Sequence, residues 1–534
     1  MCFPSRMLAW LVTGTLFCTA NLAFAGDLTT LIDREIAAKL TKEKVFPAPP
    51  ASDGEFLRRT YLDLVGTIPT ATEAREFLQS KDANKRKSLI QKLLNDPGYA
   101  IHQSTVWDQV LFGRDPLNEY ATRTRSAFQE WLRQQFEKNR PYDQIVRELI
   151  LAEQDGSEMY QVQFRNNPEE ATVAVSRIFL GIQLQCARCH DHPYENWTQK
   201  DFYGMAGFFV RLVVQEKPGS GKEKRWKIAE KSSGEVLFTG PAAEQKPGQK
   251  GVPIPPKFIT GKPLEEPALP KDFKEPDYRS AKDLPKPFFS RKTQLANWLV
   301  DHNNPYFARA LANRIWAQFM GRGLVHPVDD LSEDHPPSHP VILDALSKWL
   351  VEHHFDLKSI IPEIMLSEAY QRSSEGDSTV AMPRWYERSA VRPLSAEQLI
   401  RAFRQATEFD TPGKPEKQLP SAMKDYMMRY FGTPTDGQGE FQGSLTEHLF
   451  LNNGGHLQQL SSSGSTFARV KSASLDNAAK TEELYLSILS RFPTENEKKL
   501  IIEFLDKNQK VKIDSLIIDI MWALMNTSEF RFNH

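Results

Sequence analysis

The sequence predicts a mainly α-helical protein of two helical domains, joined by a small insert that contains some β structure. Three observations predict this class. Apolar residues recur at helical spacing on both sides of the middle of the chain. Thr70 with Glu73, and Thr494 with Glu497, have the spacing of capping boxes that begin helices. Between about 213 and 290 this pattern gives way to proline and lysine, which do not sustain a helix.

Length and charge limit the class of protein further. A chain of 534 residues is expected to form more than one domain. Its hydrophobic fraction of 40% is enough for folded cores, which excludes a wholly disordered chain. The formal net charge of -1 lacks the basic excess of a general nucleic-acid binder, so we expect no nucleic-acid partner. Four cysteines are too few for a disulfide-stapled scaffold.

The first 25 residues have the pattern of a cleavable signal peptide. Arg6 precedes a short apolar run, and Ala23-Phe24-Ala25 supplies the small residues that signal peptidase recognises. No later stretch approaches ~18 consecutive apolar residues, so we expect no transmembrane segment in the mature chain. The sequence thus predicts a periplasmic or secreted protein that retains two cysteines, Cys186 and Cys189.

The domains and their elements follow in chain order. The first helical domain is predicted over 26–212, the Pro/Lys-rich insert over 213–290 and the second helical domain over 291–534. In the insert, apolar residues at 226–228 and 236–238 predict two strands of one hairpin, with its turn at 232–234. Helical patterns in the first domain lie at 28–40, 56–64, 89–94, 131–136, 171–185 and 201–210. Those in the second lie at 295–299, 307–319, 340–349, 357–369, 395–406, 484–489 and 500–505.

The strongest chemical motif is the pentapeptide CARCH at residues 186–190. Cys186 and Cys189 are spaced to add across the two vinyl groups of one haem, and His190 then places an imidazole under the iron. Covalent attachment retains the cofactor outside the cell. The other nitrogen of His190 is expected to bond to Asp191 or to the carbonyl of Pro193, which sets the basicity of the ligand. The motif predicts haem c.

Three other interpretations of the motif stay open. Cys186 and Cys189 can form a disulfide in an oxidising compartment. They can exchange disulfides, although no β-α-β pattern surrounds them. With His190 and His192 they can bind a divalent metal, although adjacent ligands suit a tetrahedral site poorly.

The sixth iron ligand has several candidates, and it decides what a bound haem does. Met205 follows the motif on a predicted helix, whereas His192 is too close to His190 to reach the opposite face. His335 and His339 are remote in the sequence. They belong to an acidic loop that predicts either a divalent-metal site or the lead-in to a helix; its residues are Asp329, Asp330, Glu333, Asp334, His335 and His339.

Arg58, Arg59 and Asp63 lie about one helical turn apart. This spacing predicts an internal ion pair, with contact to haem propionates as an alternative.

Two segments of the chain resemble known families. The stretch QCARCHDHPYENWTQKDFYGMAGFF (Gln185–Phe209), with Phe56–Thr70 and Asn139–Leu149, resembles the planctomycete cytochrome-type domain, domain of unknown function 1549. Four later stretches resemble the partner family, domain of unknown function 1553: Asn304–Pro340, Phe355–Ser374, Arg392–Phe403 and Leu524–His534. The resemblance implies an exported, cytochrome-like protein. Relatives are often linked to polysaccharide use, which makes a polysaccharide partner an expectation by analogy.

Together these observations predict an exported c-type cytochrome-like protein that passes single electrons to or from a periplasmic redox partner. This prediction favours an electron-transfer or binding protein over an enzyme. One alternative is a haem-free structural or interaction protein, in which a Cys186–Cys189 disulfide shapes a turn and the surface binds polysaccharide or another exported protein. The other is a metal-dependent hydrolase that uses His190, His192 and the acidic loop.

Overall fold

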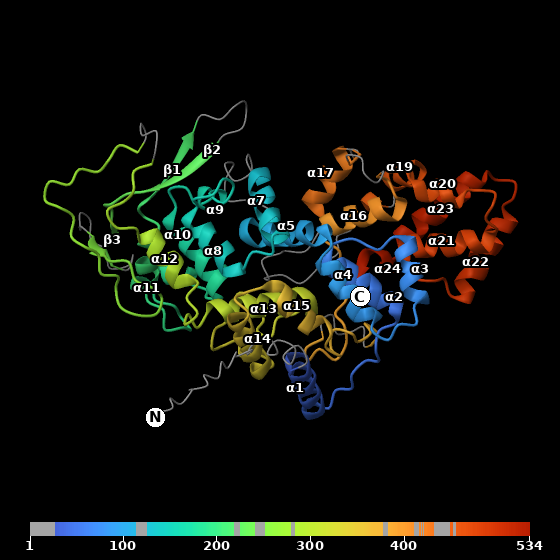
Figure 1. The fold of residues 1–534 in the computed structure, drawn as a ribbon, viewed down its shortest axis with the longest axis horizontal. Coiled ribbons are helices and arrows are strands. Elements are labelled where there is room, and N and C mark those ends of the chain that lie inside the picture. The colour runs from blue at the N-terminus through green and yellow to red at the C-terminus, as the bar shows by residue number, and fades with distance from the viewer. Residues whose placement is uncertain are drawn as a thin grey trace, which may run out of the picture.

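The computed structural model describes residues 27–113, 125–217, 225–240, 251–278, 284–376, 383–410, 416–417, 419, 421–431, 449–451 and 455–534. The predicted signal peptide lies outside these residues. The fold is mainly α-helical, as predicted, with short two-stranded sheets (Figure 1). None of the described helices combines the length and the apolar character needed to cross a membrane.

The N-terminal part of the chain forms a succession of short helices. Capping starts several of them, and the capping box predicted at Thr70 and Glu73 is confirmed. The helices are α1 (Asp27–Glu43), α2 (Asp53–Leu64), α3 (Ala71–Gln79), α4 (Lys85–Leu94), α5 (Pro97–Phe112), α7 (Arg125–Glu137), α8 (Tyr142–Leu151), α9 (Met159–Val162), α10 (Pro168–Val175) and α11 (Gln199–Ala206). Between α10 and α11 lie the π-helix η1 (Ser176–Leu180) and the 3₁₀ helix η2 (Gln185–Arg188).

The insert contains two small antiparallel sheets, and the hairpin predicted within it is wrong. Strand β1 (Leu212–Lys217) pairs with β2 (Arg225–Glu230), and β3 (Val236–Phe238) pairs with β4 (Val252–Ile254). Strand β2 therefore pairs backwards along the chain, because this register buries Trp226 and Ile228 at 4% and 5% exposure against the helices. The turn residues in the sequence did not indicate which strand β2 pairs with.

The C-terminal part is again helical. Its helices are α12 (Arg291–Leu299), α13 (Phe307–Met320), α14 (Pro340–Glu352), α15 (Leu357–Met365), α16 (Ala396–Thr407), α17 (Ser421–Tyr430), α19 (His456–Ser463), α20 (Ser465–Val470), α21 (Asn477–Leu489), α22 (Glu495–Lys507), α23 (Ile513–Met525) and α24 (Ser528–Arg531). The strands β5 (Arg392–Pro393) and β6 (Phe532–Asn533) pair antiparallel. The second predicted capping box, at Thr494 and Glu497, is confirmed at the start of α22.

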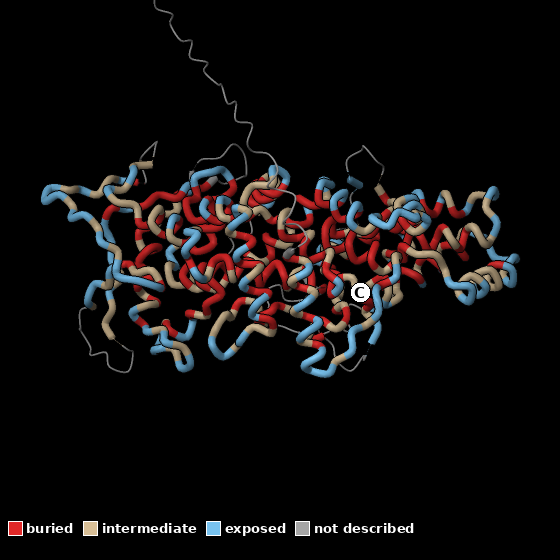
Figure 2. Tube along the Cα trace, turned by 60° about the horizontal axis from the view of Figure 1, so that its bottom comes forward, coloured by how far each residue is buried: buried red, intermediate tan, exposed pale blue. Residues whose placement is uncertain are grey.

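Buried residues extend along the whole length of the molecule and form two hydrophobic cores (Figure 2). The first core consists mainly of buried apolar residues between Leu28 and Tyr386, together with Leu486, so it includes α1, which packs on α14 and α15. The second core consists mainly of buried residues between Leu394 and Phe530. The cores therefore meet well inside the second predicted sequence domain. The domain boundaries near residues 212 and 291 stay a prediction from the sequence.

Helix α2 lies between the two cores and contributes to both. Its Phe56 and Leu57 belong to the first core, and Leu62 belongs to the second. The predicted pairing of Asp63 with an arginine of its own helix is wrong. Asp63 instead accepts two hydrogen bonds from Nη2 of Arg392, at 2.9 and 3.0 Å. The reason is burial on every side of α2, which brings partners from distant segments to its charged groups.

The arginines of α2 bind other partners. Arg58 donates to the carbonyl oxygens of Ile488 and Phe530, at 3.2 and 2.6 Å. Arg59 donates to Glu55 at 2.7 Å, one turn back on α2, and to the carbonyl oxygen of His534 at 2.9 Å. These buried hydrogen bonds connect α2 with the last residues of the chain.

Candidate functional site

The CARCH motif forms a short exposed turn at the surface of the first core. Residues 185–188 make the 3₁₀ helix η2, and the N–H of Cys189 donates to the carbonyl oxygen of Cys186 at 3.4 Å. Ala187, between the cysteines, is fully buried in the first core. Because Ala187 anchors the turn inward, both thiols lie at the surface. They are exposed and unbonded.

The Arg188 residue of the motif fastens this turn to two helices. Its guanidinium pairs with Glu169 at 2.5 Å and with Glu170 at 2.9 Å, both in the first turn of α10. Its carbonyl oxygen accepts hydrogen bonds from Gln199 Nε2 and from the Tyr203 hydroxyl of α11, each at 3.2 Å. The turn is therefore held from both sides, although each ion pair is partly exposed and worth little alone.

The two histidines of the motif region differ in which ring nitrogen is free. His190 Nδ1 lies 2.7 Å from the carbonyl oxygen of Asp191, so this nitrogen carries the proton and Nε2 keeps its lone pair. His192 is the reverse. Its Nδ1 accepts the backbone N–H groups of Tyr194 and Glu195, at 3.3 and 2.9 Å, which places the proton on Nε2. Of these two histidines, His190 is the one whose Nε2 can serve as a ligand in this arrangement.

The acidic loop supports the segment that carries the motif. The N–H of Leu331 donates to the carbonyl oxygen of Gly181 at 2.8 Å, just before η2. The N–H of Glu333 donates to Glu195 Oε1 at 3.1 Å, just after the motif. The loop therefore touches the chain on both sides of CARCH.

Asp329 anchors this loop in the core. It is 2% exposed, pairs with Arg177 at 3.0 Å and also with Arg314. Its carbonyl oxygen accepts Gln183 Nε2 at 3.1 Å. Sequence reasoning missed Arg177, Gln183 and Arg314, because they lie 15 to 152 residues from Asp329 and no local spacing points to them.

The predicted metal ligands of the loop do not converge. His335 pairs with Asp330 at 3.1 Å. His339 is buried beside Tyr386, and this burial lowers its pKa to about 4. Within the described ranges, no three side chains of His, Cys, Asp or Glu lie close enough to hold a metal ion.

Met205 lies in the first core and not at the surface of the motif. It is fully buried on α11, which begins with a capping box between Thr198 and Asp201. Reaching an iron at the exposed turn would require unpacking this side chain, which costs about 1.5–3 kcal/mol in lost burial. In the folded arrangement, Met205 is therefore packed in the core and does not face the motif.

The motif lines neither of two pockets formed by the described residues. They have volumes of about 670 and 480 Å³, and none of the residues 186–190 lines either one. The thiols and His190 fit the attachment and one axial ligand of a haem, while an enclosing apolar wall is not formed by these two pockets.

Comparison with protein families identifies the class of the chain. Residues 31–213 match PSCyt2, described as a protein of unknown function (DUF1549), and residues 291–430 match PSD1, described as a protein of unknown function (DUF1553). The chain thus belongs to the proteins that carry a DUF1549 domain followed by a DUF1553 domain. Searches of curated proteins and of solved structures give no match.

Proposed function

We propose that the chain is an exported, c-type cytochrome-like protein that carries one haem on Cys186 and Cys189, with His190 as an axial ligand. One observation carries the proposal: His190 Nδ1 is held by the Asp191 carbonyl at 2.7 Å, which leaves Nε2 free beside two exposed thiols. Metal-bound histidines commonly use the second nitrogen in this way.

The residues of the chain have distinct tasks in this proposal. The two thiols attach the cofactor, and the Asp191 carbonyl orients the imidazole and raises its basicity. Arg188 and the acidic loop hold the turn, so that the ligand and both thiols stay in register. A bound haem would supply a one-electron couple, and the exposed turn would let a periplasmic redox partner approach.

A second candidate rests on the exposure of the same thiols. In a 3₁₀ turn, residues three apart are separated by about 6 Å along the axis, which is within the range of a disulfide. A Cys186–Cys189 disulfide would make this a haem-free interaction protein, with polysaccharide or another exported protein as its partner. The third candidate, a metal-dependent hydrolase with His190, His192 and the acidic loop, gains no support, because no three such side chains among the described residues lie close enough to hold a metal ion.

The test is covalent haem content after export in a host with haem-attachment machinery. We expect a c-type pyridine haemochrome band that resists acid-acetone extraction and disappears in the Cys186→Ser, Cys189→Ser double variant. His190→Ala should keep the attached haem but change its reduced spectrum. His192→Ala is the matched control, because its Nδ1 accepts backbone hydrogen bonds, and it should leave the spectrum unchanged.

Two results would count against the proposal. A colourless protein, alongside a cytochrome that matures normally in the same cells, would overturn haem attachment. Thiol counting would then separate a disulfide from two free cysteines, and metal analysis would test the hydrolase. Equal spectral changes in His190→Ala and His192→Ala would remove His190 as the specific ligand.

A further inference from the structure

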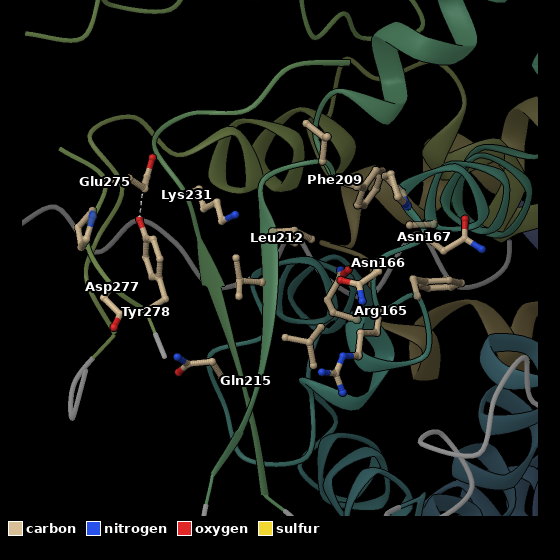
Figure 3. Close-up of a pocket in the computed structure, with 18 residues that line it drawn as sticks. Arg165, Asn166, Asn167, Phe209, Leu212, Gln215, Lys231, Glu275, Asp277 and Tyr278 are labelled. Atoms are coloured by element: carbon tan, nitrogen blue, oxygen red, sulfur yellow. Dashed lines mark hydrogen bonds between the residues drawn. The ribbon is translucent and has the colours of Figure 1, made fainter. Parts of the chain in front are cut away.

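The larger of these pockets shares no residue with the CARCH motif and lies between β1, the loop before α10 and the segment 275–278. It has a volume of about 670 Å³, which suits a small organic ligand. Figure 3 shows Glu275, Asp277 and Tyr278 on one side, Asn166 and Asn167 on the other, and the β1 residues Leu212 and Gln215 between them. Apolar side chains such as Val213 complete the lining.

One wall of this pocket is held in place by its own hydrogen bonds. The Glu275 carboxylate accepts the backbone N–H groups of Ser232 and Ser233, at 2.9 and 3.0 Å. It also accepts the hydroxyl groups of Ser233 and Tyr278, at 2.6 and 2.5 Å. Glu275 is therefore occupied by four donors. The pocket is preformed on this side, and this carboxylate has little capacity left for a ligand.

The opposite situation holds for several donors of the pocket. Gln215 is 9% exposed, lines the pocket, and its Nε2 is buried without a hydrogen-bond acceptor. Such an orphaned buried amide costs free energy, which a ligand that accepts its hydrogen bond would recover. Lys231 also lines the pocket, and within the described part of the chain its ammonium group has neither an ion pair nor a hydrogen bond.

The amides of the facing loop add to this excess of donors. Asn167 uses its side-chain oxygen to cap α10, accepting the N–H of Glu170 at 3.3 Å, so its Nδ2 stays available. The acids in the first turn of α10 are paired with Arg188 and face that residue. The free groups of the pocket are thus mainly amide donors and one ammonium.

We infer that this pocket binds a hydroxylated organic anion, whose carboxylate or phosphate is held by Lys231 and Gln215 and whose hydroxyl oxygens are bound by the amides of Asn166 and Asn167. The inference is independent of haem attachment, since the pocket shares no residue with the motif. It adds a small-molecule site to the proposed electron-transfer protein.

The test is calorimetric titration of the full chain with three probes that share the glucose skeleton: glucuronate, glucose 6-phosphate and glucose. We expect one of the two anions to bind at least tenfold more tightly than glucose, and the tighter anion identifies the acidic group. Lys231→Gln should abolish this preference. The matched control is Lys262→Gln, an exposed lysine that does not line the pocket, and it should leave the preference unchanged.

A second variant tests the orphaned amide itself. Gln215→Leu should lower the affinity for the tighter-binding anion at least fivefold. It should not lower the unfolding temperature, because it removes a buried donor that has no partner. Equal affinity for all three probes would overturn the anion site. Absence of binding by all three at millimolar concentration would overturn the pocket as a site for this class of ligand.

Discussion

At the scale of single residues, burial changes the pKa of Glu158, a carboxyl group that lines the smaller pocket. Glu148 accepts the N–H groups of Glu153 and Gln154, at 2.8 and 2.7 Å, and so organises the loop after α8. Glu158 also lies in this loop region and lines the pocket, with the N–H of Gly156 at 2.5 Å. The pKa of Glu158 is raised to about 7, chiefly by burial; backbone hydrogen bonds oppose the rise, and the negative charges of Asp155 and Glu148 contribute to it.

The raised pKa of Glu158 predicts a pH-dependent stability. Because the folded protein holds this proton more tightly than the unfolded chain does, the stabilisation is fully present below about pH 4.5 and is lost as the pH rises through about 7. Glu158→Gln mimics the protonated group and should remove this dependence. We expect the variant and the parent to unfold at similar urea concentrations at pH 5, and the variant to be more stable at pH 8.

Other carboxylates also titrate in this range, so the comparison is the difference between the two proteins at each pH. A constant difference from pH 5 to pH 8 would show that Glu158 has an ordinary pKa in the folded protein. Glu503→Gln serves as the control, because Glu503 makes only exposed ion pairs on α22 and should give no pH-dependent difference.

At the scale of elements, the segment before the motif depends on a glycine. Gly181 ends η1 with φ of 67° and ψ of 30°, in the left-handed region. A Cβ at this position would lie 2.7 Å from Cγ of Leu331, and the Gly181 carbonyl accepts the Leu331 N–H at 2.8 Å. The close approach of the acidic loop to the chain that leads into CARCH therefore requires a residue without a side chain.

Gly181→Ala should destabilise the protein more than Gly455→Ala does. Both positions are left-handed, but a Cβ at Gly455 has no atom within 4 Å. The backbone conformation alone costs about 1–2 kcal/mol, and the contact with Leu331 should add about 1–3 kcal/mol at Gly181 only. Urea unfolding of the two variants measures the difference, and equal losses would mean that the loop moves aside freely.

At the scale of the whole molecule, α2 connects the two cores. Its charged side chains bind residues from both, as Asp63 does with the hydroxyl of Tyr370 at 2.9 Å and with Asn533 Nδ2 at 2.7 Å. Removing one partner of such a buried group leaves the other without compensation, which costs several times more than breaking a surface pair. We therefore expect the two cores to unfold together.

Phe530→Ala tests this coupling from the second core. Phe530 is fully buried, and its loss should cost about 3–5 kcal/mol. Hydrogen exchange followed by mass spectrometry should then show faster exchange in α8, which belongs to the first core, as well as in α23. Phe46→Ala, at a residue that is 93% exposed, should change neither. Faster exchange in α23 with unchanged α8 would show that the cores open independently.

The sequence by itself determined the features whose partners lie within a few residues. The mainly helical class and the capping boxes at Thr70 and Thr494 depend on spacings of three or four residues. Asp191 was one of two local partners that the sequence offered for His190, and the structure shows that its backbone carbonyl is the atom that bonds. Short-range hydrogen bonds and helical periodicity can be predicted from the order of residues, because the interacting groups are close in the sequence.

Only the tertiary structure decided the pairings between distant segments. It paired Asp63 with Arg392, 329 residues away, and Asp329 with Arg177, 152 residues away. It also paired β2 with β1, placed Met205 in the core and brought Gln215 and Lys231 into one pocket. The physical reason is that a buried charge or an edge strand pairs with whichever partner the packing of the cores brings near. The spacing of neighbouring residues in the sequence does not identify that partner.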